Sequence, residues 1–240
     1  NSKVNYNSSL TSHFTNETLK QNNLADGSQV YPPQSGFSEA SLNSIIARVN
    51  YTLLDRYNAT VTFRADNSSR FAKTHRWGHF PSVGLSWNAN RESFLRDVRN
   101  LSNLKVRASW GKVGNQEIGD YEYALNYKAT QYNGQSSYTK TNIYNKDLRW
   151  ETTTSYNVGA DIGFFDNRLA ITADAYYKKT SDLLLDVPIG FNQGVSTQLR
   201  NVGNVVNKGV ELTIDGQLLR KRDLLWTVTA NIAHNCNRIT

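Results

Sequence analysis

The chain has 240 residues, a formal net charge of +7, a mean hydropathy of −0.58 and 38% hydrophobic residues. These values exclude a helical membrane protein, because no stretch approaches about eighteen consecutive apolar residues. They are compatible with a transmembrane β-barrel, in which only alternate residues of each strand are apolar. The single cysteine, Cys236, excludes an internal disulfide framework and a multi-cysteine metal site.

Apolar and polar residues alternate from residue 44 to near the end of the chain. Because successive side chains of a strand point to opposite faces, this alternation predicts strands with one apolar face. The clearest runs are 44–52, 59–66, 83–87, 104–110, 155–164, 169–178, 210–215 and 226–232. None of their apolar faces carries a charge, and we predict about nine or ten strands in all. Only residues 91–102 also permit a short turn of helix.

The connections between these runs differ in length. Those around 54–57, 165–168 and 219–223 are short, and Asp166-Asn167 supplies residues that tolerate a tight turn. The connections at 67–77, 113–151 and 180–205 are long, polar and rich in Asn, Gln, Gly and Tyr. This rough alternation of short and long connections is typical of an outer-membrane barrel, with short periplasmic turns and long extracellular loops.

Strand length and aromatic placement separate two alternatives, a membrane barrel and a soluble secreted β-sandwich that binds carbohydrate. We expect the complete strands to extend over about nine to eleven residues, which suits a tilted crossing of a bilayer better than a globular strand. Large aromatics stand at the ends of the apolar faces, as in a membrane-interface girdle. We predict this interface role for Tyr51, Trp87, Trp110, Tyr156, Phe164, Tyr177 and Trp226. Both features favour the barrel.

Four stretches are distinctive beyond their alternation: "SSRFAKTHRWGHFPSVGLSW" (68–87), "LKVRASWGKVGNQEIGDYEY" (104–123), "LRWETTTSYNVGADIGFFDNRLAITADAYYKKTSDLLL" (148–185) and "NVGNVVNKGVELTI" (201–214). In their order along residues 40–240 they resemble the barrel of SusC/RagA-family TonB-dependent transporters. That family carries a DGSSRF-like turn, a W-G…FPS strand entry, an LKLRASWG…GNQ strand exit, a W-E-x-T strand start and an NKG-(V)-E segment. The departures are mild, namely Asn67 for Gly, His79 for an aromatic and Val113 for Thr.

The resemblance implies an all-β fold, an antiparallel transmembrane β-barrel segment. Residues 1–240 would supply part of the barrel domain of a roughly 22-stranded receptor, with the plug domain and the remaining strands absent. The chain begins at Asn1 and contains no Met, which also predicts a part of a longer protein. An unclosed sheet leaves edge groups that lipid cannot satisfy, so the rest of the barrel must pair with it.

By the same resemblance, the function is TonB-dependent import of large nutrients, oligosaccharides or peptides, across the outer membrane of a Gram-negative bacterium. The implied partners are a SusD-like surface lipoprotein, TonB acting through segments absent here, the lipid bilayer, and the rest of the barrel with its plug. No enzymatic activity and no cofactor are implied.

The long loops carry aromatics interleaved with amides, which suits contact with sugar, peptide or a partner protein. The candidates for substrate or partner contact are Tyr132, Tyr138, Tyr144, Trp150 and Phe191. The alternative is that these rings pack the loops against one another. The sequence gives no metal-ligand spacing among its four histidines and no catalytic constellation. The basic cluster at 220–222 fits a solvated turn better than a nucleic-acid site.

Overall fold

The computed structural model describes residues 2–14, 27–96, 98–133 and 135–240, without the side chains of residues 30–34, 131 and 191. The chain divides into two units, Asn1–Leu42 and Asn43–Thr240. In the described residues the strands are β1 (Ser2–Phe14), β2 (Gly27–Ala40), β3 (Leu42–Leu53), β4 (Tyr57–Ser68), β5 (Trp77–Asn88), β6 (Leu101–Asn115), β7 (Tyr127–Tyr132), β8 (Gln135–Lys140), β9 (Glu151–Phe164), β10 (Leu169–Ser181), β11 (Leu184–Pro188), β12 (Thr197–Asn201), β13 (Asn204–Lys221) and β14 (Leu224–Ile239). The described helices are the 3-10 turns η3 (Lys73–His75), η4 (Ala89–Arg91) and η5 (Phe191–Gln193). None of them has the length and hydrophobicity to cross a membrane.

The first unit is an antiparallel hairpin. β1 pairs with β2 from Ser2 opposite Ala40 to Phe14 opposite Gly27, with an irregularity between Ser8 and Leu10. These strands were not predicted, because their residues are mostly polar and do not alternate regularly.

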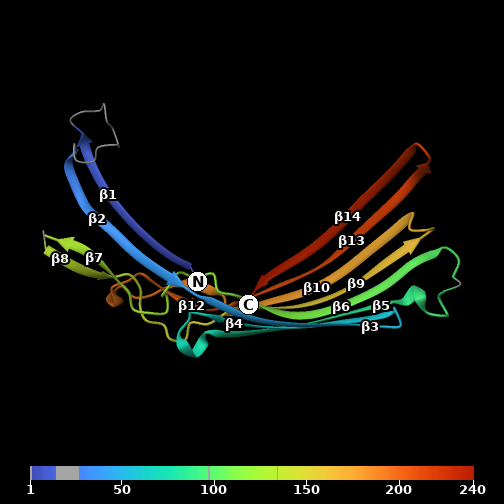
Figure 1. Cartoon of the computed structure of the whole chain (residues 1–240), viewed down its shortest axis with the longest axis horizontal. Coiled ribbons are helices and arrows are strands. Elements are labelled where there is room, and N and C mark those ends of the chain that lie inside the picture. Colours follow the sequence, from blue (N-terminus) through green and yellow to red (C-terminus); the bar gives the residue numbers. More distant parts are fainter. Residues whose placement is uncertain (1, 15–26, 97, 134) are drawn as a thin grey trace. The chain divides into compact units, whose positions relative to one another are not determined.

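The second unit is built on one antiparallel sheet of eight strands in the order β14-β13-β10-β9-β6-β5-β4-β3. Figure 1 shows these eight strands side by side in a single curved layer. Two further hairpins, β7-β8 and β11-β12, form separate two-stranded sheets within the long loops. Each of the eight clearest runs lies in a strand of this sheet, so the fold class inferred from alternation and resemblance is confirmed. The strands have 12 to 18 residues, more than the nine to eleven predicted.

The ends of this sheet differ as predicted. Residues 54–56, 165–168 and 222–223 form tight turns at one end, which also carries the β5–β6 connection. Phe165, Asp166 and Asn167 all have positive φ, and Asp and Asn tolerate that conformation better than most residues. At 91–102 the predicted turn of helix is reduced to η4 and turns that include one i→i+4 hydrogen bond, from Arg96 N to Glu92 O at 2.9 Å.

The register places apolar and polar residues in alternating rows across the sheet. One row, on what we call the apolar face, contains Trp87, Val106, Ala160, Ala173, Leu212 and Ile232. The adjacent row, on the polar face, contains Ser86, Arg107, Gly159, Asp174 and Glu211. A one-residue slip would exchange the two faces, so the alternation itself fixes this register.

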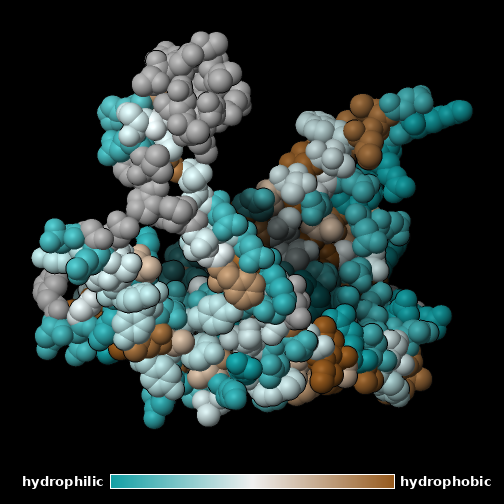
Figure 2. Space-filling model, turned by 60° about the vertical axis from the view of Figure 1, so that its left-hand side comes forward, coloured by the Kyte–Doolittle hydropathy of each residue, from teal (hydrophilic) through white to brown (hydrophobic). Residues whose placement is uncertain are grey.

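The apolar face is uncovered in the described part of residues 43–240. Val49, Val158 and Ile232 on it are 66%, 58% and 72% exposed. Figure 2 shows hydrophobic residues gathered in brown patches on a surface that is otherwise largely hydrophilic. A β-sandwich packs its apolar faces against each other, so the absence of a second layer here contradicts the sandwich alternative for this unit.

Glu92 ties together three elements at the turn end of the sheet. Its carboxylate accepts hydrogen bonds from the Tyr57 hydroxyl at 2.5 Å, the Trp87 indole N–H at 3.1 Å and the Arg56 guanidinium at 2.9 Å. These donors stabilise the ionised form and lower the pKa of Glu92 from its ordinary value of 4.5, the Tyr57 hydrogen bond having the largest effect.

We expect the stability supplied by Glu92 to depend on pH. Because its pKa is lower in the folded state, the contribution is complete above the unfolded value of 4.5 and is lost as the pH falls through the folded pKa. Denaturant midpoints measured between about pH 3 and 7 should show Glu92→Gln less stable than the unmodified protein above pH 5, the difference shrinking in acid. A difference that grew in acid would contradict this account.

Candidate functional site

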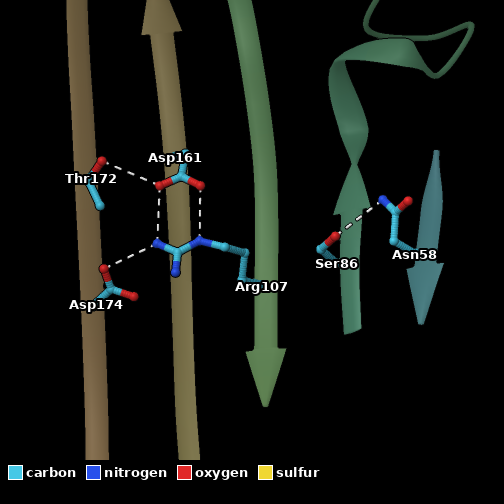
Figure 3. Close-up of polar contacts among 6 residues, drawn as sticks. All are labelled: Asn58, Ser86, Arg107, Asp161, Thr172 and Asp174. Carbon is cyan, nitrogen blue, oxygen red and sulfur yellow. Dashed lines mark hydrogen bonds and ion pairs between the residues drawn. The ribbon is translucent and has the colours of Figure 1, made fainter. Parts of the chain in front are cut away.

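An ion-pair network crosses the middle of the polar face. Arg107 on β6 makes a bidentate contact with Asp161 on β9, Nε to Oδ2 at 2.9 Å and Nη2 to Oδ1 at 3.1 Å. Its Nη2 also reaches Asp174 on β10 at 3.1 Å, and the Thr172 hydroxyl donates to Asp161 at 3.3 Å. Figure 3 shows the guanidinium lying between the two carboxylates, so one side chain links three adjacent strands.

Gly159 leaves the space through which the Arg107 side chain reaches Asp174 across β9. It lies between Arg107 and Asp174 in the polar row, and a Cβ there would lie 2.9 Å from Arg107 Nη2 and 2.1 Å from Asp174 Oδ1. Gly84, on the same face of β5, has nothing within 4 Å of the equivalent position. A side chain at Gly159 would therefore separate the ion pair, whereas one at Gly84 would point into open space.

The network borders a shallow depression of about 270 Å³ on the polar face. Its lining is mostly small and polar, and Asn58 donates to the Ser86 hydroxyl at 3.2 Å across it. The described residues contain no group of three or more His, Cys, Asp or Glu placed to hold a metal ion. The depression therefore offers hydrogen-bonding groups and charge to an aqueous or protein neighbour.

A compact aromatic core lies at the loop end of the sheet. Its buried residues are Phe71, Phe80, Ile118, Leu148 and Trp150, and Tyr123, Leu184 and Leu199 pack against it. The Trp150 ring centroid lies 5.2 Å from that of Phe71 and 5.4 Å from that of Phe80, the latter edge-on. The Trp150 indole N–H donates to the carbonyl of Arg76 at 3.1 Å, so its polar atom is also satisfied.

Two glycines admit the Phe80 ring to this core. A Cβ on Gly78 would lie 2.4 Å from Phe80 Cζ, and one on Gly114 would lie 2.1 Å from it. The segments that carry the family resemblance therefore meet here: Phe71 comes from the SSRF turn, Gly78 and Phe80 from WGHFPS, and Gly114 from the GNQ exit. The packing of one aromatic core therefore accounts for residues in several of these motifs.

The segment before β9 is also bound to the β11–β12 hairpin. The backbone N–H of Arg149 donates to Asn201 Oδ1 at 2.9 Å, and Asn201 Nδ2 donates back to the carbonyl of Arg149 at 2.7 Å. The Arg149 side chain pairs with Asp182 at 2.7 Å. The loops around the core are therefore held in one arrangement by side-chain amides as well as by burial.

The predicted contact aromatics fall into different environments. Tyr132, Tyr138 and Tyr144 are 80%, 73% and 54% exposed, and their contacts with substrate or partner stay a prediction. Trp150 is only 6% exposed and belongs to the loop core, so its ring supports the loops and offers little surface to a ligand. The Phe191 side chain lies outside the described part of the chain.

The predicted interface aromatics lie near the two ends of the apolar face. Trp110, Tyr156 and Tyr177 share one row of adjacent strands on the side nearer the loops. The other four aromatics lie near the turn end of the sheet. Tyr51 is close to the β3–β4 turn and Trp87 is close to η4. Phe164 is beside the β9–β10 turn and Trp226 is beside the β13–β14 turn. The two groups bracket a zone of Ala, Val, Leu and Ile.

Sequence reasoning missed the ion-pair network, although it placed Arg107 and Asp161 on polar faces. The available signal was a charged residue on the polar face of each of three consecutive runs, but the register decides which of these residues meet. β6 and β9 are joined by a 35-residue connection, 116–150, and no local pattern specifies the register across it.

The sequence model of one family, described as TonB dependent receptor-like, beta-barrel, matches residues 2–235. The chain belongs to this family. It is 41% identical over 209 residues to the TonB-dependent receptor SusC of Bacteroides thetaiotaomicron, covering 83% of this chain and 21% of that receptor. It is 36% identical over 235 residues to the TonB-dependent receptor P3 of Formosa agariphila, covering 95% of this chain and 23% of the relative.

Among solved structures, this receptor barrel segment is similar to the RagAB peptide importer in its closed-closed state. The TM-score is 0.87 at 29% identity, over 99% of this chain and 27% of the importer chain. The segment thus spans about a fifth to a quarter of the length of the relatives it matches.

We expect Gly159→Ala to destabilise the receptor barrel, because the new methyl group separates Arg107 from Asp174. Loss of a partly exposed ion pair costs about 0.2–1 kcal/mol, measured as the denaturant midpoint of receptor in detergent. Gly84→Ala is the matched control and should be neutral. Adding Asp174→Ala should recover part of the loss; additive losses would contradict a shared contact.

Trp150→Ala should loosen the loops of the receptor, since removal of a buried aromatic ring costs about 3–5 kcal/mol. The measurement is limited proteolysis with mass identification of cuts within 116–150. Tyr132→Ala, at an exposed ring, is the control and should leave the cutting pattern unchanged. Equal protease resistance of the two variants would show that the loop core does not depend on Trp150.

Proposed function

We propose that this chain forms part of the wall and outer loops of a TonB-dependent importer in the outer membrane of a Gram-negative bacterium. The observation that carries the proposal is the eight-stranded sheet with an apolar face that is free of charge between its aromatic rows, in a chain that matches a TonB-dependent receptor barrel over residues 2–235. The apolar face would contact lipid and the polar face the lumen. The loop end would face the cell exterior.

The dimensions of the apolar zone support this orientation. Tyr156 and Phe164 are eight residues apart on β9, which corresponds to roughly 27 Å along a strand at about 3.4 Å per residue. A tilt of about 40° reduces this to roughly 20 Å, close to the apolar band of about 25 Å in outer-membrane barrels. The aromatic rows would then lie at the two membrane interfaces, as proposed for Trp110, Tyr177 and their counterparts at the turn end.

Edge strands explain why the remainder of a barrel is needed. β3 and β14 each have one edge without a partner in the described sheet, and such backbone groups cannot remain unsatisfied in lipid. We propose that the sheet continues through further strands of the same receptor. Energy from the inner membrane would reach a plug domain through TonB, by way of parts of the receptor outside these 240 residues.

The proposed cargo is a large nutrient, an oligosaccharide or a peptide, and the proposed partner is a SusD-like surface lipoprotein. The supports are the relatives, one a SusC receptor and another described as a peptide importer. The chain's own residues would bind, orient and enclose cargo without covalent chemistry. Loss of cargo uptake on deletion of the receptor gene or on removal of TonB, with uptake restored by the receptor gene, would test the proposal directly. Uptake that persists without TonB would contradict it.

If the apolar face contacts lipid, arginine should be tolerated at one of two neighbouring positions on β13 and not at the other. Leu212→Arg places a charge on the apolar face and should cost about 2–4 kcal/mol, lowering the amount of folded receptor in purified outer membranes. Thr213→Arg, one residue along β13, points to the polar face and should assemble normally. Heat-modifiable mobility on gels measures the folded fraction. Equal assembly of both variants would contradict contact of this face with lipid.

A further inference from the structure

A polar hollow of about 570 Å³ lies among the loops, between the segment before β9 and strand β12. Residues from both segments line it: Tyr144, Asn145, Lys146, Asp147, Arg149, Gln198, Arg200 and Asn201. Its volume falls in the range of small-molecule sites, about 300–1,000 Å³. It is separate from the depression beside Arg107 on the polar face of the sheet.

The hollow is formed before any ligand arrives. Asn145 Nδ2 donates to the carbonyl of Leu199 at 2.8 Å, and Gln198 Nε2 donates to the carbonyl of Tyr144 at 3.3 Å. The reciprocal hydrogen bonds between Arg149 and Asn201 close the other end. Below these contacts Leu148 is fully buried in the loop core. The two walls are therefore fixed, and binding needs little ordering of the loops.

The side-chain amides of Asn145, Gln198 and Asn201 donate their hydrogen bonds to the backbone of the hollow's walls, so other groups are left to contact a ligand. Tyr144 is 54% exposed, so its ring offers a flat apolar face at the rim. Arg149 is paired with Asp182, but no ion pair involves Lys146 or Arg200 in the described part of the chain. Arg200 uses its Nε to hold Gln198 Oε1 at 2.7 Å, which fixes the guanidinium and leaves its other N–H groups available.

The cations outnumber the acids in the lining. The lining contains the cations Lys146, Arg149 and Arg200 and the single acid Asp147. The charge of Arg149 is balanced by its ion pair with Asp182. A fixed guanidinium and a nearby ammonium match a carboxylate, and such charge-assisted hydrogen bonds are stronger than neutral ones. The lining therefore favours an anionic ligand.

The edge of β12 disfavours a peptide. An extended peptide commonly binds by adding a strand to an exposed sheet edge, where it pairs with free backbone groups. On β12 the carbonyl of Leu199 is already taken by the Asn145 side chain. A sugar chain does not require that pairing, and its rings present apolar faces that an aromatic ring such as Tyr144 can cover.

We propose that this hollow binds an acidic oligosaccharide, a sugar chain that carries carboxylate groups, with Lys146 and Arg200 contacting the carboxylates and Tyr144 stacking on a sugar ring. The inference rests on the proposed function, since it names the cargo class of the same importer. Because the cations are partly exposed, binding weakens as salt rises.

The test uses the full-length receptor in detergent and two probes of equal length, a hexamer of galacturonate and neutral maltohexaose, with a hexapeptide of glutamate as a third. We expect the galacturonate hexamer to bind most tightly. The double variant Lys146→Gln with Arg200→Gln should weaken that binding about tenfold or more, because it removes both charge-assisted contacts with the carboxylates. Tyr144→Ala should weaken it, whereas Tyr144→Phe should retain it.

The matched control is Lys128→Gln with Lys140→Gln, which removes two positive charges from the β7–β8 hairpin outside the lining. The affinity of this control variant for the galacturonate hexamer should be unchanged. Preference for maltohexaose or for the glutamate peptide, or equal loss in both double variants, would overturn the proposal. TonB-dependent uptake of a neutral sugar or a peptide would leave the proposed importer intact and reject the acidic cargo, whereas no TonB-dependent uptake of any probe would count against the importer itself.

Discussion

The eight-stranded sheet presents one face without Asp, Glu, Lys or Arg between its aromatic rows, and no described part of residues 43–240 packs against that face. Between the aromatic rows, alternation with a period of two places every charged side chain of the wall on the opposite face. The polar residues must then satisfy one another or a neighbour across the sheet, as Arg107 does by linking β6, β9 and β10. The rest of the structure depends on this separation.

The wall and the loops are stabilised in different ways. In the wall, the strands are held by backbone hydrogen bonds, and side chains add contacts along rows. At the loop end, by contrast, a buried aromatic core forms around Trp150, with glycines where the Phe80 ring needs space. This core gives long polar connections a fixed conformation, which is a condition for presenting Tyr144 and Arg200 in a defined hollow.

Local pattern predicted the wall strands and the end at which each turn lies, because both follow from alternation and from short-range turn chemistry. It did not predict β7, β8, β11 or β12, which are only five or six residues long and are stabilised by pairing within a hairpin. Nor did it distinguish Trp150 from Tyr144. Both are loop aromatics among polar residues, and only the packing of Leu148 and Phe71 shows that one ring is buried and the other exposed.

The sequence by itself determined the two faces of the sheet and, through its motifs, the family resemblance, since these depend on residue type and spacing along the chain. Only the tertiary structure decided the register that places Arg107 beside Asp161, that Gly159 lets Arg107 reach Asp174, and that residues 144–149 join 198–201 around one hollow. The physical reason is that these contacts join residues about 50 or more positions apart. Their proximity is fixed by strand order and loop packing, and no local sequence period encodes either.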